Sequence, residues 1–228
     1  YEYLKQVGGK VFVDVKDEIQ YQQAQGGDLI LFNQNDDSIR FVSADPYLNV
    51  SVGQENVTTN LVGDYNFQNI AAAFSMAHYF GISHKLIAKA LREFSPEENR
   101  SQFIETSNNQ IILDAYNANP SSMELAIRNF AQLKGQPKSV ILGDMLELGE
   151  SSFDEHLATI RQLQEHDFDN LFLVGDNFAK HQKSTDHFRF FKSFEELKKH
   201  VENHPLKNQL ILIKGSRGIA LERSLDFL

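Results

Sequence analysis

Residues 113–127, LDAYNANPSSMELAI, put four polar side chains directly after an apolar run: Asp114, Tyr116, Asn117 and Asn119. The apolar run predicts a short buried strand, and the residues after it predict a turn and then a helix. In open α/β sheets, ligands bind at the turns that follow the carboxyl ends of strands. Asp and Asn also bond readily within turns. The stretch therefore has two interpretations, a ligand-binding loop or a self-bonded turn.

Asp114 has the sharpest chemical role in this turn. A carboxylate at the end of the first strand of a nucleotide-binding sheet can accept hydrogen bonds from ribose hydroxyls. The alternative is a carboxylate that only caps the turn. Ser121 and Glu124 have the spacing of a capping box, so the helix is predicted to open there.

A second polar loop, LGDMLELGE at 142–150, places Asp144 and Glu147 between two glycines after another predicted strand. Two nearby carboxylates can orient a cation or an amine, although acidic loops are usually just solvated. His156, in the helix that follows, either approaches the same loop or serves in packing. We predict no metal site, and the absence of cysteine excludes thiolate ligands.

A third loop, IKGSRG at 213–218, offers Lys214, Ser216 and Arg217 where the last predicted strand opens into a helix. Backbone N–H groups at a helix start, together with Arg, make a site for a carboxylate or a phosphate. The structural alternative is a solvated glycine turn. The loop is not a P-loop, because G-x-x-x-x-G-K-[ST] is absent.

Two amides and an arginine complete the candidates. Asn66 and Asn69, in GDYNFQNIAAA at 63–73, stand three residues apart at a helix start, which aligns both side chains on one face. An amide has the donor and the acceptor that an adenine edge requires, whereas N-capping is the structural alternative. Arg100 stands at a predicted domain junction, where it could reach a phosphate held between domains.

The elements that must position these residues differ between the two halves. The second half alternates strand-like runs and helices in five units, which predicts a mostly parallel sheet covered on both faces, a Rossmann-like α/β domain. Its runs lie at 111–113, 139–144, 170–177, 188–191 and 210–217, with further helices from about Ser152, at 193–204 and at 218–228. Ser152 with Glu155, and Ser193 with Glu196, repeat the capping-box spacing.

The first half has strand-like runs and only two predicted helices. The runs lie at 9–15, 28–34, 39–45 and 56–63, and the helices at 68–80 and 83–94, the second with Ser83 as N-cap. Two helices cannot cover both faces of four strands, so this half is interpreted as the tail of a larger domain. The boundary is placed in the polar stretch 95–99, giving domains 1–95 and 96–228.

Composition excludes several classes of protein. The net charge of −9 argues against a nucleic-acid surface, which relies on clustered Lys and Arg. No stretch has the roughly 20 apolar residues of a membrane span. The lack of cysteine is compatible with a reducing compartment, and the first residues lack the apolar core of a signal peptide. A cytoplasmic protein is expected.

Four of these blocks together resemble the Mur ligases of bacterial cell-wall synthesis. DAYNANPSSM is the most distinctive, because the branch that joins D-alanyl-D-alanine to UDP-N-acetylmuramoyl-tripeptide carries D-[SA]-Y-N-A-N-P-x-S-M there. LGDMLELGE with His156, KGSRG and GDYNFQNIAAA match further blocks in the family's order. Two positions depart from the family: Tyr65 replaces a histidine and Asn99 replaces a glycine.

The resemblance implies an ATP- and Mg²⁺-dependent peptidoglycan ligase. The substrate carboxylate would be phosphorylated to an acyl phosphate, which the dipeptide amine attacks with loss of phosphate. Asn69 would contact adenine with Asn66 in support, Asp114 would contact ribose, and Arg100 would face the phosphates as a catalytic residue when the domains close. The residues implied to line the dipeptide cleft are Tyr116, Asn117, Asn119, Lys214, Ser216 and Arg217.

The resemblance also implies a domain plan. Residues 1–95 would be the C-terminal part of the central ATPase domain, and 96–228 the family's C-terminal domain. The family's P-loop, its magnesium-binding glutamate and its modified lysine are not in this sequence, so magnesium ligands are expected mainly outside it. We therefore expect the 228-residue chain alone to lack ligase and ATPase activity. For the whole enzyme, a monomer is favoured.

Three rival functions remain at this stage. A folylpolyglutamate synthase shares the domain plan, but the YNANP block speaks against it. A non-catalytic nucleotide-binding module is supported by the absent P-loop. A Rossmann oxidoreductase is weakly supported, because no G-x-G-x-x-G follows any predicted strand.

Overall fold

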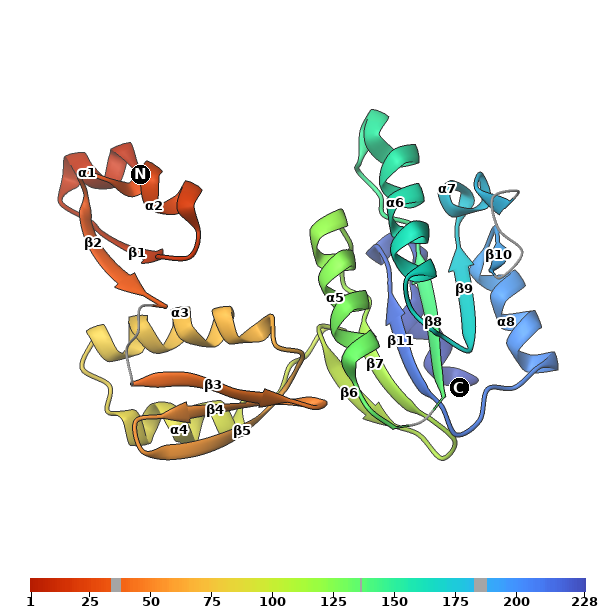
Figure 1. Cartoon of the computed structure of the whole chain (residues 1–228), viewed down its shortest axis with the longest axis horizontal. Coiled ribbons are helices and arrows are strands. Elements are labelled where there is room, and N and C mark those ends of the chain that lie inside the picture. The colour runs from red at the N-terminus through yellow and green to blue at the C-terminus, as the bar shows by residue number, and fades with distance from the viewer. Residues whose placement is uncertain (34–37, 136, 183–187) are drawn as a thin grey trace. The chain divides into compact units, whose positions relative to one another are not determined.

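The computed structural model describes residues 1–33, 38–135, 137–182 and 188–228 (Figure 1). The chain divides into two compact units. The N-terminal unit comprises Tyr1–Asn60 and Asp64–Ser95, and the C-terminal unit comprises Leu61–Gly63 and Pro96–Leu228. In the described ranges, no helix combines the length and the apolar character needed to cross a bilayer.

The N-terminal unit contains a two-stranded parallel sheet and a three-stranded sheet of order β3-β4-β5. Its elements are α1 (Glu2–Val7), β1 (Lys10–Asp14), α2 (Glu18–Ala24), β2 (Asp28–Phe32), β3 (Ile39–Ala44), β4 (Tyr47–Val52), β5 (Glu55–Val62), α3 (Asn66–Tyr79) and α4 (His84–Glu93). The expected set of four strands with two helices is wrong, because the sequence analysis missed β4, α1 and α2. The end of the strand predicted at 28–34 lies outside the described residues.

Short and weakly patterned elements explain these misses. α2 buries only Ala24 and α1 buries no residue, so neither has the apolar stripe that a helix prediction needs. The longer helices are patterned and were predicted. α3 buries Ile70, Ala71 and Phe74, and the hydroxyl of Ser83 accepts a hydrogen bond from Leu86 N at 3.4 Å, as expected for the N-cap of α4.

The C-terminal unit is built on a six-stranded sheet of order β10-β9-β8-β11-β7-β6. Its elements are β6 (Gln102–Glu105), β7 (Gln110–Asp114), α5 (Pro120–Gln132), β8 (Lys138–Gly143), η1 (Gly149–Ser151), α6 (Ser152–Gln164), β9 (Asn170–Val174), α7 (Asp176–Ala179), β10 (Arg189–Phe191), α8 (Phe194–Asn203), β11 (Leu210–Lys214), η3 (Arg217–Ile219) and η4 (Leu221–Asp226). Every neighbouring pair is parallel except β6 with β7. The predicted mostly parallel α/β sheet is confirmed, while the antiparallel edge strand β6 was not predicted.

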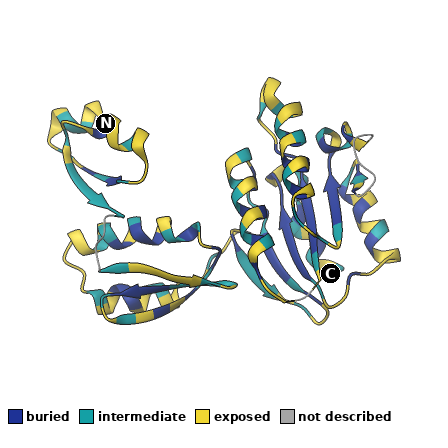
Figure 2. Cartoon of the chain, in the orientation of Figure 1, coloured by how far each residue is buried: buried dark blue, intermediate teal, exposed yellow. Residues whose placement is uncertain are grey.

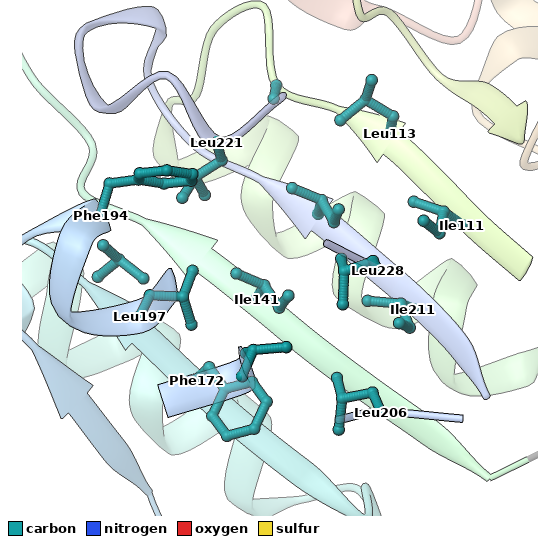
Figure 3. Packing of buried hydrophobic residues seen from close by; sticks show 14 of the residues in the cluster. Ile111, Leu113, Ile141, Phe172, Phe194, Leu197, Leu206, Ile211, Leu221 and Leu228 are labelled. Carbon is teal, nitrogen blue, oxygen red and sulfur yellow. The ribbon is translucent and has the colours of Figure 1, made fainter. Parts of the chain in front are cut away.

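Both faces of this sheet are covered. Alternate side chains of the strands, such as Ile111 and Leu113 of β7, pack with α8 and the C-terminal 3-10 segment in one apolar cluster (Figure 3). α5 and α6 contact each other and cover the other face (Figure 1). The inner strands are accordingly buried, and the outer sides of the helices are exposed (Figure 2). This sandwich holds the carboxyl ends of the strands in fixed positions.

The N-caps predicted for α5 and α6 are wrong, although α6 begins at Ser152 as predicted. α5 begins at Pro120, because Asn119 is the N-cap: its side chain accepts from Ser122 N, and Ser122 Oγ accepts from Asn119 N. The N–H of a first helical residue has no partner within the helix, so proline, which lacks this N–H, suits that position. The helix therefore begins at Pro120 with Asn119 as its N-cap, and not after Ser121. α6 follows η1 with Ser151 as N-cap and no side-chain cap bond, so the capping box at Ser152 is wrong.

Of the other two helix predictions in the C-terminal unit, one is confirmed and one is wrong. Ser193 caps α8, as predicted, by accepting a hydrogen bond from Glu196 N at 3.3 Å. The helix predicted at 218–228 is instead the pair of 3-10 segments η3 and η4. Ala220 stands between them with a φ of 54°, a left-handed conformation that cannot continue an α-helix.

Candidate functional site

Strand register brings two of the predicted residues, Asp114 and Lys214, into one row with Ser101. β7 and β11 are parallel neighbours, and Asp114 and Lys214 are Cα partners at their carboxyl ends. On the other side of β7, Leu113 pairs with Gln102, so Ser101 lies beside Asp114. The row therefore consists of one residue from each of three adjacent chain segments.

The carboxylate of Asp114 is bonded on both oxygens. Oδ2 accepts from Lys214 Nζ at 2.6 Å, and Oδ1 accepts from Ser101 N at 3.1 Å and from Ser101 Oγ at 3.4 Å. The Lys214 side chain is 2% exposed and that of Asp114 is 18% exposed. Nζ of Lys214 also donates to Asn117 O at 3.3 Å. This buried ion pair links β11 to the polar turn after β7.

Arg100 stands in a backbone segment of unusual conformation. Its neighbours Asn99 and Ser101 have φ values of 59° and 46°. Asparagine adopts this left-handed conformation more readily than other non-glycine residues, which explains how it stands where the resemblance expects glycine. Asn99 N donates to Gln102 Oε1 at 3.1 Å. The exposed Arg100 side chain places its guanidinium carbon 3.7 Å from the ring centroid of Tyr116.

The remaining residues of the predicted cleft are mostly bonded within the chain. Asn117 Oδ1 accepts from Ala118 N at 2.8 Å, and Asn119 caps α5. Ser216 is 4% exposed, and its Oγ accepts from Leu146 N at 2.9 Å. The asparagines are bonded within the turn, as the self-bonded interpretation predicts, and Asp114 is bonded to Lys214. Ligand binding by this turn stays a prediction.

Asp144 does not fit the idea of a solvent-facing carboxylate that orients a cation. Its side chain is buried and accepts from Asn177 N at 2.8 Å and Phe178 N at 2.9 Å, which caps the short helix α7. Gly175 makes room for it, since a Cβ there would lie 2.3 Å from Asp144 Cγ. Glu147 is exposed and has a φ of 66°. The two carboxylates do not form a pair.

His156 serves in packing, in agreement with the structural alternative. Its ring is fully buried, with Nδ1 2.6 Å from Ser152 O and Nε2 3.1 Å from Met145 N. Nδ1 therefore donates and Nε2 accepts, which is the neutral tautomer. Burial lowers the pKa of His156 below its usual range, although Asp144 Oδ1 lies 3.5 Å from Nε2. The histidine thereby stabilises the loop after β8 through its hydrogen bond with Met145 N.

The depressed pKa of His156 predicts a loss of stability in mild acid. Above about pH 7 the histidine is neutral in the folded and unfolded states. As the pH falls through about 6.5, the unfolded chain takes up a proton that the folded chain refuses, so the free energy of unfolding falls by up to about 1.4 kcal/mol per pH unit per such group. The loss ends below the folded-state pKa.

Hydrogen exchange of the β8 amides between about pH 7.5 and 5.5, corrected for intrinsic exchange rates, measures this loss. His181 and His200 also have pKa values lowered mainly by burial and contribute to the wild-type slope. His156→Gln is expected to flatten the pH dependence. The control His166→Gln, in the same unit, should keep it. Equal slopes in wild type and His156→Gln would contradict the prediction.

The amide pair of the N-terminal unit has the expected arrangement on α3. Asn66 is buried, and its Oδ1 accepts from the Nδ2 of the exposed Asn69 at 3.1 Å. Asn69 lines a cavity of about 670 Å³ together with Asp14 and Lys16, at the carboxyl end of β1. Asn66 thus restrains the orientation of the Asn69 amide.

One metal-ligand spacing in the sequence was not predicted. His200 and His204 stand four residues apart, as paired ligands on a helix do. Their rings stack on each other with centroids 4.6 Å apart, and His204 lies beyond the end of α8. Among the described residues, no group of three His, Cys, Asp or Glu side chains could hold a metal ion.

Ser101 is the residue of the row that the sequence analysis did not identify. A serine beside an arginine carries no signal alone. Its position follows from the antiparallel pairing of β6 with β7, and a strand of only four residues without full burial is hard to predict.

The chain is similar in sequence to proteins of one known family. The sequence profile of "Mur ligase, glutamate ligase domain" matches residues 99–217. The UDP-N-acetylmuramoyl-tripeptide–D-alanyl-D-alanine ligase of Bacillus subtilis is 33% identical over 171 residues, 71% of this chain and 37% of that protein. The enzyme of the same name from Rickettsia prowazekii is 29% identical over 176 residues, 75% of this chain and 39% of that protein.

A solved structure agrees with both relatives. MurF from Acinetobacter baumannii superposes with a TM-score of 0.79 and 26% identity over 96% of this chain and 51% of that chain. The chain thus spans well under half the length of the two relatives. Since the family profile covers more than half of the 228 residues, the chain belongs to the Mur ligase family.

Proposed function

We propose that the chain is part of an ATP-dependent cytoplasmic ligase that joins D-alanyl-D-alanine to UDP-N-acetylmuramoyl-tripeptide in peptidoglycan synthesis. The observation that carries the proposal is the row Ser101–Asp114–Lys214 at the carboxyl end of the sheet, with Arg100 and Tyr116 beside it. The names of the two relatives support this substrate over folate. The reaction would form an acyl phosphate, which the dipeptide amine attacks to give the amide and phosphate.

The exposed residues fit direct contacts with ATP or substrate. The carboxylate of Asp114 has about four acceptor positions and receives three donors in the chain, so it can still accept from a ribose hydroxyl. The exposed guanidinium of Arg100, which lies against Tyr116, suits the phosphates. Asn69, held by Asn66, suits the adenine edge. Asn117 and Arg217 remain as contacts for the dipeptide or for a phosphate, while the ring of Tyr116 lies against the guanidinium of Arg100.

The buried residues fit a different role within the same site. Lys214 would act by neutralising Asp114 and fixing the turn at Asn117, since its ammonium group is almost fully buried. Ser216 and Asn119 would act by holding the loop after β8 and the start of α5. Bound Mg²⁺ would neutralise the phosphate charge, and we assign none of its ligands to the described residues.

The test is phosphate release by the full-length enzyme that contains this chain, with ATP, magnesium, the UDP-sugar tripeptide and D-alanyl-D-alanine each omitted in turn. We expect release to require every component. The 228-residue chain alone, which has no P-loop sequence, should release no phosphate above background. Release that is indifferent to the dipeptide would exclude the proposed substrate, and glutamate with a folate should then be tried.

A further inference from the structure

One aromatic ring lies within reach of two arginines from different loops. The guanidinium carbon of Arg100 is 3.7 Å from the ring centroid of Tyr116, and that of Arg217 is 5.5 Å from it. Arg100 precedes β6, Tyr116 follows β7 and Arg217 follows β11. Since β6, β7 and β11 are neighbours in the sheet, the ring is the point where these three loops meet.

The two guanidinium groups differ in their ion pairing from other exposed arginines of the chain. In the described part of the chain, neither Arg100 nor Arg217 has an ion pair with a carboxylate. Other exposed arginines of the chain do have one, as Arg92, Arg128 and Arg223 each pair with a glutamate. Asp114 is the acidic residue of the row Ser101–Asp114–Lys214, and its charge is already matched by Lys214. The pair therefore presents net positive charge to solvent.

The face of Tyr116 attracts both cations without cancelling their charge. An aromatic face attracts a guanidinium within about 6 Å of its centroid through its quadrupole, while remaining neutral. An arginine side chain is otherwise one of the most mobile in a protein. The ring thus restricts two long side chains and leaves their charge in place. A carboxylate would also have restricted them, but it would have neutralised their charge.

The backbone under Arg100 is fixed as well. Ser101 N is bonded to Asp114 and Asn99 N to Gln102, on either side of the arginine. Tyr116 is half-buried on the turn that Lys214 holds through Asn117 O. Both the Tyr116 ring and the backbone of Arg100 therefore lie on segments that are bonded to the row Ser101–Asp114–Lys214.

We propose that Tyr116 is a positioning residue that preorganises Arg100 and Arg217 as one binding site for a phosphate chain. The proposal rests on the proposed function for the identity of the anion, and it replaces a direct contact of Tyr116 with the dipeptide. The hydroxyl plays no part in this role, because the ring face makes both contacts. Removing the ring should weaken phosphate binding, whereas removing the hydroxyl should not.

The experiment titrates the 228-residue chain with inorganic triphosphate at low salt, followed by calorimetry. Tyr116→Phe should bind within about twofold of wild type, and Tyr116→Leu about five- to thirtyfold more weakly, the equivalent of losing two cation–π contacts. Tyr116→Trp should bind at least as tightly as wild type, since Trp has the strongest face. Phe153→Leu, an exposed aromatic of the same unit, is the matched control and should not change binding.

This readout separates positioning from mere structure and from the proposed reaction. No nucleotide, sugar or dipeptide is present, so the result stands whether or not the ligase assay succeeds. In the full-length enzyme, Tyr116→Leu should raise the KM for ATP while Tyr116→Phe leaves it unchanged. Absence of triphosphate binding by the wild type, equally tight binding by Tyr116→Leu, or equal weakening in Tyr116→Phe would each overturn the proposal.

Discussion

Asp114→Ala is expected to lower the free energy of unfolding of the C-terminal unit by about 3–5 kcal/mol, the cost of leaving a buried charge without its partner. Lys214 is 2% exposed, and among the described residues its ammonium group would keep only the Asn117 carbonyl as a partner. The substitution also leaves Ser101 N without its acceptor. Both losses fall on the same row of three segments.

Hydrogen exchange of the β7 and β11 amides measures this loss within the C-terminal unit. Glu202→Ala removes one partner of the exposed pair Lys198–Glu202 on α8 and is the matched control, with an expected change of less than about 1 kcal/mol. The double variant Asp114→Ala with Lys214→Met removes both charges and should recover much of the loss. A change below about 1 kcal/mol in Asp114→Ala would show that the pair is not a buried ion pair in solution.

Arg100→Gln is expected to lower the kcat/KM of the full-length enzyme by about 10²–10³, the range seen when one preorganised group that stabilises transition-state charge is removed. Glutamine keeps much of the length of the side chain and its hydrogen-bonding capacity but not its charge. Because the Arg100 side chain is exposed and makes no ion pair in the described part of the chain, the substitution should leave the stability nearly unchanged. Loss of activity without loss of stability is the signature of a residue that acts on a ligand.

Steady-state phosphate release with all substrates measures this effect. Arg128→Gln is the matched control, because Arg128 is exposed on α5 and pairs only weakly with Glu124 at 3.9 Å. It should retain the wild-type rate. Activity of Arg100→Gln within about twofold of wild type, with a normal unfolding transition, would exclude charge stabilisation by Arg100.

The sequence predicted elements whose signals are local. The β strands of the C-terminal unit show apolar runs because both of their faces are buried, and Ser193 can be identified as an N-cap from its own helix alone. The α5 cap was placed two residues too late, because Asn119 and Ser122 compete with Ser121 and Glu124 for the same spacing. Equal spacing cannot rank two neighbouring candidates.

The site itself depends on partners that no local signal reveals. Asp114 was identified by its place after a strand, yet its contacts with Lys214 and Ser101 depend on which strands become neighbours. For His156 the sequence left open a place near the polar loop or a role in packing, and Ser216 was assigned to the dipeptide cleft by the family resemblance. Their burial, and the backbone N–H groups that they accept from, could only be found in the folded chain.

The position of β11 affects the order in which the sheet of the C-terminal unit assembles during synthesis. β11 is made last among the strands but lies between β7 and β8, so the sheet exists as two separate pieces until it inserts. Asp114 and Lys214 are 100 residues apart in the chain. Contacts over such distances close a large loop before they return any stabilisation and therefore form late. During synthesis Asp114 and Lys214 can meet only after β11 has been made, so the ion pair that links β7 to β11 is absent from any shorter nascent chain.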